Sequence, residues 1–322
     1  MRRRELLVLC CGGMLVSPLA ARAQGRTRIG YLGAAPRSSA SVRAFFDELK
    51  RLGYAEGRNL DALYHDIGED PGRLPQFAAA MAGAHLGAIV ADGSEAPLRA
   101  ARAAAPGTPV VIVAVNYDPV ARGYAASLAH PGGEVTGVLF RSLEIVGKQV
   151  ELLKTMMPRA SRLTIVWGVE NPDEFAAAKA GAKAQGLDVQ SFELGPPPYD
   201  FEAMFRRLAQ GAPAMVLMLS PPGFAAHHRR VAGLALRHRL PAMFRFKDFV
   251  EAGGLISYGV NRAAMRRRAA DYVAKILAGA RPGDLPIERA DTFELAVNLK
   301  TARALGIVIP PRILARADEV IQ

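Results

Sequence analysis

The stretch PVVIVAVNYDPVAR, residues 109–122, joins a run of β-branched residues to a polar segment and then to Pro119. A run that is apolar on both faces is typical of a central strand in a sheet covered by helices on both sides. Asn116, Tyr117 and Asp118 follow this predicted strand. In open α/β sheets ligands bind beyond the carboxyl ends of such strands, so we predict ligand contacts here. The alternative is that Asp118 only caps the helix that begins at Pro119.

Strand and helix patterns alternate with short connections from residue 27 onward, which is typical of parallel sheets flanked by helices. The predicted strands of the first half are residues 28–32, 59–64, 87–91 and 110–115. The second half repeats the order, with predicted strands at residues 162–167, 187–192, 214–219 and 240–244. We therefore predict an α/β fold with two Rossmann-like lobes, each built on a parallel sheet.

Two glycine-rich segments, residues 132–138 and 253–259, are predicted to cross between the lobes. A long amphipathic helix at 262–277 and a strand at 293–298 follow the second of them. Three extended crossings form a hinge, and the simplest assignment returns the long helix to the first lobe. Lobe 1 is then residues 24–138 plus 260–290, and lobe 2 is residues 139–259 plus 291–322.

The first 23 residues have the three parts of a secretory signal. Arg2, Arg3 and Arg4 precede an apolar run at 6–19, and Ala-Arg-Ala follows at 21–23. We expect export to the periplasm and cleavage after Ala23, by either the general or the twin-arginine route. No later apolar run is long enough to span a bilayer, so we expect no stable membrane insertion after cleavage.

The composition excludes several kinds of chemistry. Both cysteines, Cys10 and Cys11, lie in the leader. The mature chain therefore has no disulfide, no thiolate metal site and no cysteine nucleophile. The formal charge is +11, but the basic residues are scattered without interleaved aromatics, so we expect a solvated surface and no nucleic-acid partner.

Enzyme signatures are missing from the sequence. It contains no dinucleotide fingerprint, phosphate-binding loop, nucleophile elbow or zinc-protease motif. His227 and His228 point about 100° apart on a helix, which disfavours shared metal ligation. We predict no catalytic residue, no metal and no cofactor. The alternative from the enzyme class is a secreted hydrolase that uses Asp92, Ser94 or Asp118.

Two lobes that face each other across a hinge form a cleft, and the carboxyl ends of their strands point into it. Helix N-termini behind these loops favour a carboxylate or another anion, and Asp92 or Asp118 can pair with an ammonium group. Trp167 either stacks on the ligand or covers the core. The predicted ligand-binding residues are Ala34, Ala35, Ser38, Asp92, Gly93, Ser94, Asn116, Tyr117, Asp118, Trp167, Asn171, Ser220, Pro221, Phe244 and Tyr258.

Several sequence blocks carry a family likeness. They are Leu-Gly-Tyr-Ala-Glu-Gly-Arg-Asn at 52–59, Asp-Pro-Val at 118–120, Ser-Leu-Ala-His-Pro-Gly-Gly-Glu-Val-Thr-Gly at 127–137, Arg-His-Arg-Leu-Pro-Ala at 237–242, Ala-Gly-Gly-Leu-Ile-Ser-Tyr-Gly at 252–259, Asp-Leu-Pro-Ile-Glu at 284–288 and Asn-Leu-Lys-Thr-Ala-Arg-Ala-Leu-Gly at 298–306. With these blocks in order, the chain resembles the TrpX-type (ABC_sub_bind) family of ABC transporter substrate-binding proteins. The resemblance implies a periplasmic-binding-protein type I fold that closes on a solute and delivers it to an ABC permease.

The leading hypothesis is therefore a periplasmic solute-binding protein without enzymatic activity. Some members of the family resemble binders of aromatic amino acids, so the solute class is an amino acid or a related organic anion. Two departures from the family pattern, at residues 115–119 and 167–172, leave the solute open. Besides the hydrolase, the remaining alternative is the effector-binding domain of a regulator, which shares the fold.

Overall fold

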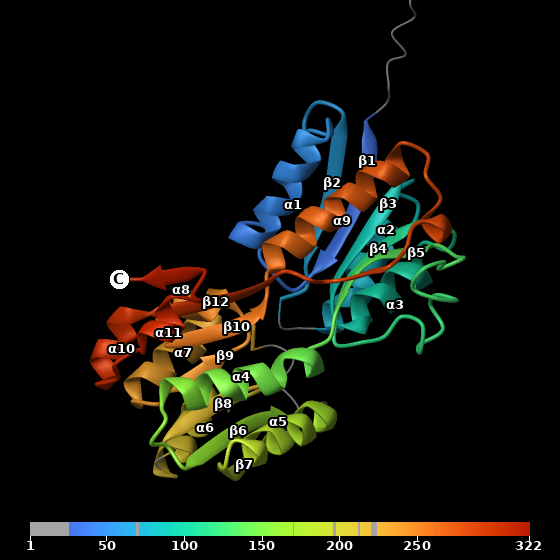
Figure 1. Cartoon of the computed structure of the whole chain (residues 1–322). Helices are drawn as coiled ribbons and strands as arrows, with labels where there is room; N and C mark the ends of the chain where they lie inside the picture. The colour runs from blue at the N-terminus through green and yellow to red at the C-terminus, as the bar shows by residue number, and fades with distance from the viewer. Residues whose placement is uncertain (1–25, 69–70, 170, 196–197, 212, 220–223) are drawn as a thin grey trace, which may run out of the picture.

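The computed structural model describes residues 26–322 except 69–70, 170, 196–197, 212 and 220–223. The leader, Ser220 and Pro221 therefore lie outside the described residues. Figure 1 shows two lobes, each a sheet flanked by helices, with the chain passing between them. In the described part of the chain, no helix is both long enough and apolar enough to cross a membrane.

The sheet of lobe 1 is parallel throughout, in the order β11-β5-β4-β3-β1-β2. Its strands are β1 Thr27–Gly33, β2 Leu60–Asp66, β3 Ala88–Gly93, β4 Val110–Val115, β5 Val135–Phe140 and β11 Glu288–Arg289. Its helices are α1 Ala40–Arg51, α2 Leu74–Met81, α3 Glu95–Ala104 and α9 Arg262–Leu277, with short 3₁₀ helices η1 Pro71–Arg73 and η2 Pro282–Asp284. In Figure 1, α9 lies beside α1 on the first sheet, although it comes late in the sequence.

The predicted central strand is confirmed as β4. Val111 and Val113 belong to the hydrophobic cluster that contains α1 and α9 residues, whereas Val110 and Ile112 belong to the cluster that contains α2 and α3 residues. Alternate side chains of β4 are thus buried on opposite faces of the sheet, and both faces need an apolar residue.

The sheet of lobe 2 has the order β13-β12-β10-β9-β8-β6-β7. Its strands are β6 Arg162–Gly168, β7 Asp188–Leu194, β8 Met215–Met218, β9 Ala242–Phe244, β10 Ile256–Val260, β12 Phe293–Asn298 and β13 Glu319–Ile321. Its helices are α4 Leu143–Met156, α5 Pro172–Ala184, α6 Phe201–Gln210, α7 His228–Arg237, α8 Lys247–Glu251, α10 Leu299–Leu305 and α11 Pro311–Leu314. The pairing of β10 with β12 is antiparallel, and the other pairings are parallel.

Three short crossings join the lobes: β5 to α4, β10 to α9, and β11 to β12. The predicted fold class, two lobes with a three-strand hinge, is confirmed. The glycine-rich segments are not themselves the crossings, because most of their residues form or precede β5 and β10, which end at Phe140 and Val260. The expected division after residue 138 falls inside β5, and we propose lobe boundaries at the ends of these strands.

Candidate ligand-binding site

A pocket of about 100 Å³ lies where the two lobes meet. Its lining residues are Asn116, Arg141, Ser142, Leu143, Asn171, Pro172, Asp173 and Glu174. Asn116 follows β4 in lobe 1, residues 141–143 lead from the first crossing into α4, and residues 171–174 begin α5 in lobe 2. Of the predicted site residues, Asn116 and Asn171 are therefore brought together across the lobe interface.

The side-chain amide of Asn116 acts both as a hydrogen-bond donor and as an acceptor. Its Nδ2 donates to Oε1 of Glu174 over 2.7 Å, and its Oδ1 accepts from the backbone N–H and the hydroxyl of Ser142 at 2.8 and 2.6 Å. Its φ of 63° lies in the left-handed region, which asparagine tolerates better than most residues. Asn116 thus joins the end of β4 to both the first crossing and lobe 2.

Glu174 forms a buried ion pair with Arg245, which the sequence prediction did not include. The side chains are 8% and 3% exposed, and Arg245 also donates to the carbonyl of Leu219. Burial raises the pKa of the Glu174 carboxyl, and the charge of Arg245 opposes that shift. Asn171 Nδ2 donates to Glu174 Oε1 at 3.2 Å. The buried Asn171 Oδ1 has no hydrogen-bond partner within the described part of the chain.

Two helices begin at this pocket. Ser142 and Asn171 are the N-cap residues of α4 and α5, and neither makes a side-chain capping hydrogen bond. A helix N-terminus carries a partial positive charge. In α4 the N–H groups of Glu144 and Ile145 already donate to the carbonyls of Arg141 and Ser142, and Pro172 at the start of α5 has no N–H. Arg141 adds a cation that is 40% exposed and lies 4.0 Å from Asp118. The pocket thus combines a positive charge that suits an anion with the unpartnered acceptor Asn171 Oδ1, which suits an ammonium group.

Asp92 lies in a different network, inside lobe 1. Its Oδ2 accepts from the Tyr31 hydroxyl at 2.6 Å and from Arg266 Nη2 at 2.7 Å. Arg266 also donates to Ser41 Oγ at 2.7 Å. Burial and the nearby Asp92 charge raise the pKa of Tyr31. The counter-charge of Asp92 in this arrangement is therefore the guanidinium of Arg266 on α9.

The remaining predicted residues of lobe 1 lie near the ends of β1, β3 and β4. Ala34 and Ser38 are exposed, Ala35 is buried, Gly93 ends β3 and Ser94 is the N-cap of α3.

Tyr117 is 6% exposed, and its hydroxyl has no partner in the described structure. Asp118 Oδ1 accepts from the backbone N–H groups of Val120 and Ala121 at 2.9 and 3.2 Å. This is the capping role that the sequence left as an alternative, in a turn rather than an α-helix.

The aromatic candidates of lobe 2 pack against neighbours in their own lobe. Trp167 stacks on Phe175 with ring centroids 4.6 Å apart, and its Nε1 donates to Ser191 Oγ at 2.8 Å. Phe244 is fully buried and stacks on Phe249 at 4.8 Å. Tyr258 lies 6.3 Å from Phe293 of β12. Their contact with a solute stays a prediction.

A larger hollow of about 330 Å³ lies beside the hinge, between α9 and the segment from β11 to β12. Its charged lining residues are Arg267, Arg268, Asp271, Glu288, Arg289 and Asp291. Arg268 is already paired with Glu288 and Asp271 at 2.6 and 3.2 Å. We take the smaller pocket as the candidate site because it lies at strand ends and is lined by both lobes.

Among the described residues, no cluster of His, Asp or Glu side chains is arranged to hold a metal ion.

Comparisons with known proteins identify a family. The model of a family described as ABC transporter substrate binding protein matches residues 35–321. The chain is 22% identical over 275 residues to the tyrosine-binding protein of Clostridioides difficile (strain R20291), covering 84% of this chain and 78% of that protein.

Solved structures show the same fold. A conserved domain protein from Vibrio cholerae superposes with a TM-score of 0.79 at 25% identity, covering 91% of this chain and 99% of that chain. An ABC domain from Streptococcus pneumonia in complex with L-Trp also superposes at 0.79, with 22% identity and 92% and 100% coverage.

Two lobes on mostly parallel sheets, joined by three crossings, have the arrangement of the type I periplasmic-binding fold. The chain belongs to the ABC transporter substrate binding protein family. The resemblance found in the sequence is confirmed, and the comparisons give no support to the hydrolase alternative.

Proposed function

We propose that the mature chain is a periplasmic, non-enzymatic receptor that captures one small molecule between its lobes and delivers it to the permease of an ABC importer. The secretory-signal pattern of residues 1–23, with its predicted cleavage after Ala23, supports export. Family membership supports the partnership with an ABC permease. Closure about the three crossings buries the solute, and the closed surfaces then dock on the permease.

The observation that carries this proposal is the pocket at which α4 and α5 begin. Its helix N-termini and Arg141 suit the carboxylate of an amino acid. Asn171 Oδ1, which has no hydrogen-bond partner in the described structure, suits its ammonium group. The similarity to proteins described with tyrosine and with L-Trp supports an amino acid as the solute class.

The size of the pocket has a consequence for this solute. A pocket of about 100 Å³ is small beside an aromatic amino acid. It would take the charged head group, and a large side chain would extend beyond it.

Isothermal titration calorimetry of residues 24–322 with the common amino acids and small organic acids tests this function. We expect binding of at least one amino acid, and about tenfold weaker binding by Arg141→Gln, because a charge-assisted contact to the carboxylate is lost. Arg162→Gln, at the exposed start of β6, is the matched control with unchanged affinity. A chain that binds none of these solutes, or binds one equally well without Arg141, contradicts the proposal.

A further inference from the structure

The side-chain amide of Asn171, which lines the candidate pocket, is hydrogen-bonded at one end only. Its Nδ2 donates to Glu174 Oε1 at 3.2 Å, whereas its Oδ1 is buried and meets no partner among the described residues. The donor and the acceptor of asparagine lie on opposite arms of one planar amide. Whatever group holds the Nδ2 arm therefore also decides where the acceptor arm lies, and here that group is Glu174.

The ionised carboxylate of Glu174 can accept hydrogen bonds but cannot donate one. Its Oε2 accepts from Arg245 Nη2, and the charge of Arg245 opposes the rise in the carboxyl pKa that burial causes. Its Oε1 also accepts from Asn116 Nδ2 at 2.7 Å. An oxygen that only accepts excludes the reversed amide, in which Asn171 Oδ1 would face it.

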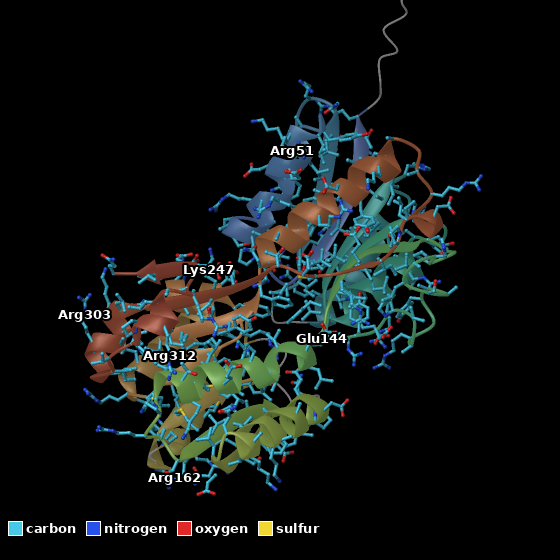
Figure 2. All side chains as sticks on the ribbon, viewed as in Figure 1. Arg51, Glu144, Arg162, Lys247, Arg303 and Arg312 are labelled. Atoms are coloured by element: carbon cyan, nitrogen blue, oxygen red, sulfur yellow. The ribbon has the colours of Figure 1, made fainter. Side chains whose placement is uncertain are left out.

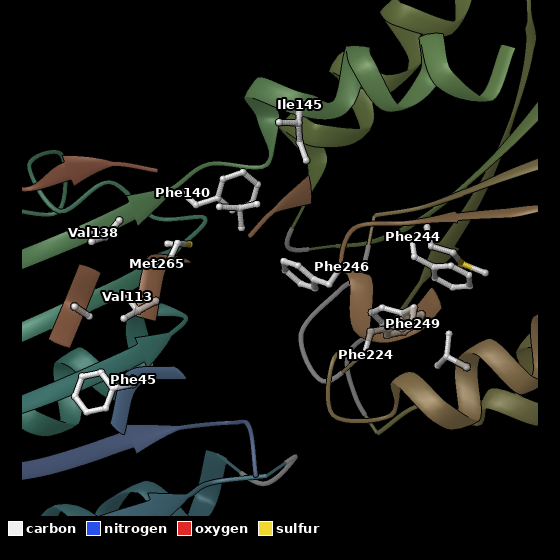
Figure 3. Close-up of a cluster of buried hydrophobic side chains, with 14 of the residues drawn as sticks. Phe45, Val113, Val138, Phe140, Ile145, Phe224, Phe244, Phe246, Phe249 and Met265 are labelled. Atoms are coloured by element: carbon white, nitrogen blue, oxygen red, sulfur yellow. The ribbon is translucent and has the colours of Figure 1, made fainter. Parts of the chain in front are cut away.

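Arg245 is itself fixed within lobe 2. Its side chain is 3% exposed, and it also donates to the carbonyl of Leu219. Its chain neighbours Phe244 and Phe246 are buried as well. Figure 3 shows the Phe244 and Phe249 side chains together in lobe 2, with Phe246 on the side that faces lobe 1. The guanidinium beside Glu174 is therefore held by packing on both sides of its own backbone position.

The contacts among Asn171, Glu174 and Arg245 all lie in lobe 2. Asn171 and Glu174 belong to the start of α5, and Arg245 follows β9. These contacts therefore do not depend on the distance between the lobes. Figure 2 shows Glu144, in the first turn of α4, near the junction of the lobes, next to the pocket residue Leu143. The amide of Asn171 is thus oriented by one lobe at the place where both lobes meet.

We infer that the pair of Glu174 and Arg245 fixes the orientation of the Asn171 amide, so that the pocket presents an acceptor and selects a solute with a hydrogen-bond donor at that point. Glu174 is then a positioning residue and not a solute contact. The inference rests on the proposed function and deepens it, because it names the residues that distinguish an amino acid from a carboxylic acid without an ammonium group. A buried acceptor that meets no donor costs free energy, and this cost disfavours the second kind of solute.

Glu174→Gln tests the inference because it reverses the arrangement with little change in shape. Arg245 has only donors, so it requires the oxygen of the new amide. The NH₂ group of the new amide then faces Asn171, whose own amide turns to offer Oδ1 to it and Nδ2 to the pocket. We expect the preference for an amino acid over its deaminated analogue to fall at least about tenfold.

The ratio of two affinities separates positioning from a general loss of structure. Asn116 is held by two hydrogen bonds from Ser142 and loses its contact with residue 174 in this variant, whichever solute is bound. A cost of that kind weakens both solutes equally and leaves their ratio unchanged. Only a change in what Asn171 presents to the solute alters the ratio.

The probes are L-tyrosine and L-tryptophan, with phloretic acid and indolepropionic acid as their deaminated analogues. Similar proteins are described with tyrosine and with L-Trp, which is why these pairs are used. Isothermal titration calorimetry of residues 24–322 gives the Kd of each probe and hence the ratio within each pair.

The double variant Asn171→Asp/Glu174→Gln is the rescue. Aspartate carries an acceptor on both arms, so it accepts from the new amide and still presents an oxygen to the solute. We expect this variant to regain the preference for the amino acid. Glu202→Gln on α6, which removes an ion pair with the exposed Arg237, is the matched control and leaves the ratio unchanged.

Neutron diffraction from perdeuterated, solute-free crystals locates the deuterium atoms of the Asn171 amide directly. We expect Nδ2 to face Glu174 in wild type and to face the pocket in Glu174→Gln. An Nδ2 that faces the pocket in wild type overturns the inference. An unchanged ratio in folded Glu174→Gln, checked by circular dichroism, overturns it equally. If wild type binds neither pair of probes, the neutron result alone decides the inference, and the wider calorimetric screen judges the proposed function separately.

Discussion

Arg266 Nη2 on α9 lies 2.7 Å from Asp92 Oδ2 at the end of β3, and the two side chains are only 2% and 5% exposed. Removing one member leaves a buried charge without its counter-charge. We predict that Arg266→Met lowers the free energy of unfolding by about 3–5 kcal/mol in urea titrations. The double variant Arg266→Met/Asp92→Asn should recover part of this loss. If Arg266→Met alone costs less than ~1 kcal/mol, the pair does not stabilise lobe 1 as described.

The carboxyl of Glu294 on β12 provides a pH prediction. Burial raises its pKa to about 7, nearby Asp248, Glu319 and Asp318 add to the shift, and Lys247 opposes it. Because the pKa in the folded protein exceeds the ordinary value of 4.5, the folded protein binds this proton more tightly than the unfolded chain. The proton's contribution to the free energy of unfolding is therefore complete below about pH 4.5 and is lost as the pH rises through about 7.

Replacing Glu294 with glutamine removes this titration but keeps an acceptor for Asn261 Nδ2, which donates to Glu294 at 2.9 Å. At pH 8 we predict that Glu294→Gln is more stable than wild type by about 1 kcal/mol, a value reduced for solvent screening. At pH 5 the difference should shrink toward zero. Thermal unfolding at the two pH values measures it, and an equal difference at both would show that Glu294 does not titrate between them.

Gly259 on β10 lies against the backbone of the Arg245 loop. A methyl group at this position would overlap the carbonyl oxygen of Arg245. We predict that Gly259→Ala destabilises the protein by about 2 kcal/mol and weakens solute binding, because Arg245 holds Glu174. Gly233→Ala in α7, where a methyl group meets open space, is the control and should stabilise by up to ~1 kcal/mol. Equal unfolding midpoints for the two variants would rule out the overlap.

Variants of Asp118 distinguish its capping of backbone N–H groups from the contact with a solute that the sequence left open. We predict that Asp118→Asn preserves both stability and solute affinity, because asparagine accepts the same backbone hydrogen bonds. Asp118→Ala should cost about 1 kcal/mol in urea titrations. A tenfold loss of affinity in Asp118→Asn would instead show that its charge pairs with the solute.

Much of the fold was predictable from local patterns. The apolar run at 110–115 and the helix at 262–277 were predicted with the bounds that β4 and α9 have. By contrast, the sequence pattern did not predict α4, although half of its residues are buried. Its apolar residues spread over a wide face, so the contrast between an apolar and a polar face is weak. The crossings were placed in glycine-rich segments that form strands, because glycine within a strand also marks a close approach of two backbones, as at Gly259.

The site was predictable only in part. Asn116 and Asn171 follow strands, and the rule that ligands bind beyond strand ends predicted both as ligand contacts. Both line the candidate pocket, and their contact with a solute stays a prediction. Glu174, Arg245 and Arg266 were missed because their roles depend on partners 58 to 174 residues away in the sequence. A charged residue on the buried side of a predicted helix, as Arg266 is on α9, was the one available signal that a buried counter-charge exists.

A crystal structure of residues 24–322 with the solute identified by calorimetry decides whether the pocket between the lobes is the binding site. We predict one solute molecule between the lobes, with its charged head group in contact with Arg141 or Asn171. A solute bound in the larger hollow between α9 and β11, or on the outer surface of one lobe, would contradict capture between the lobes.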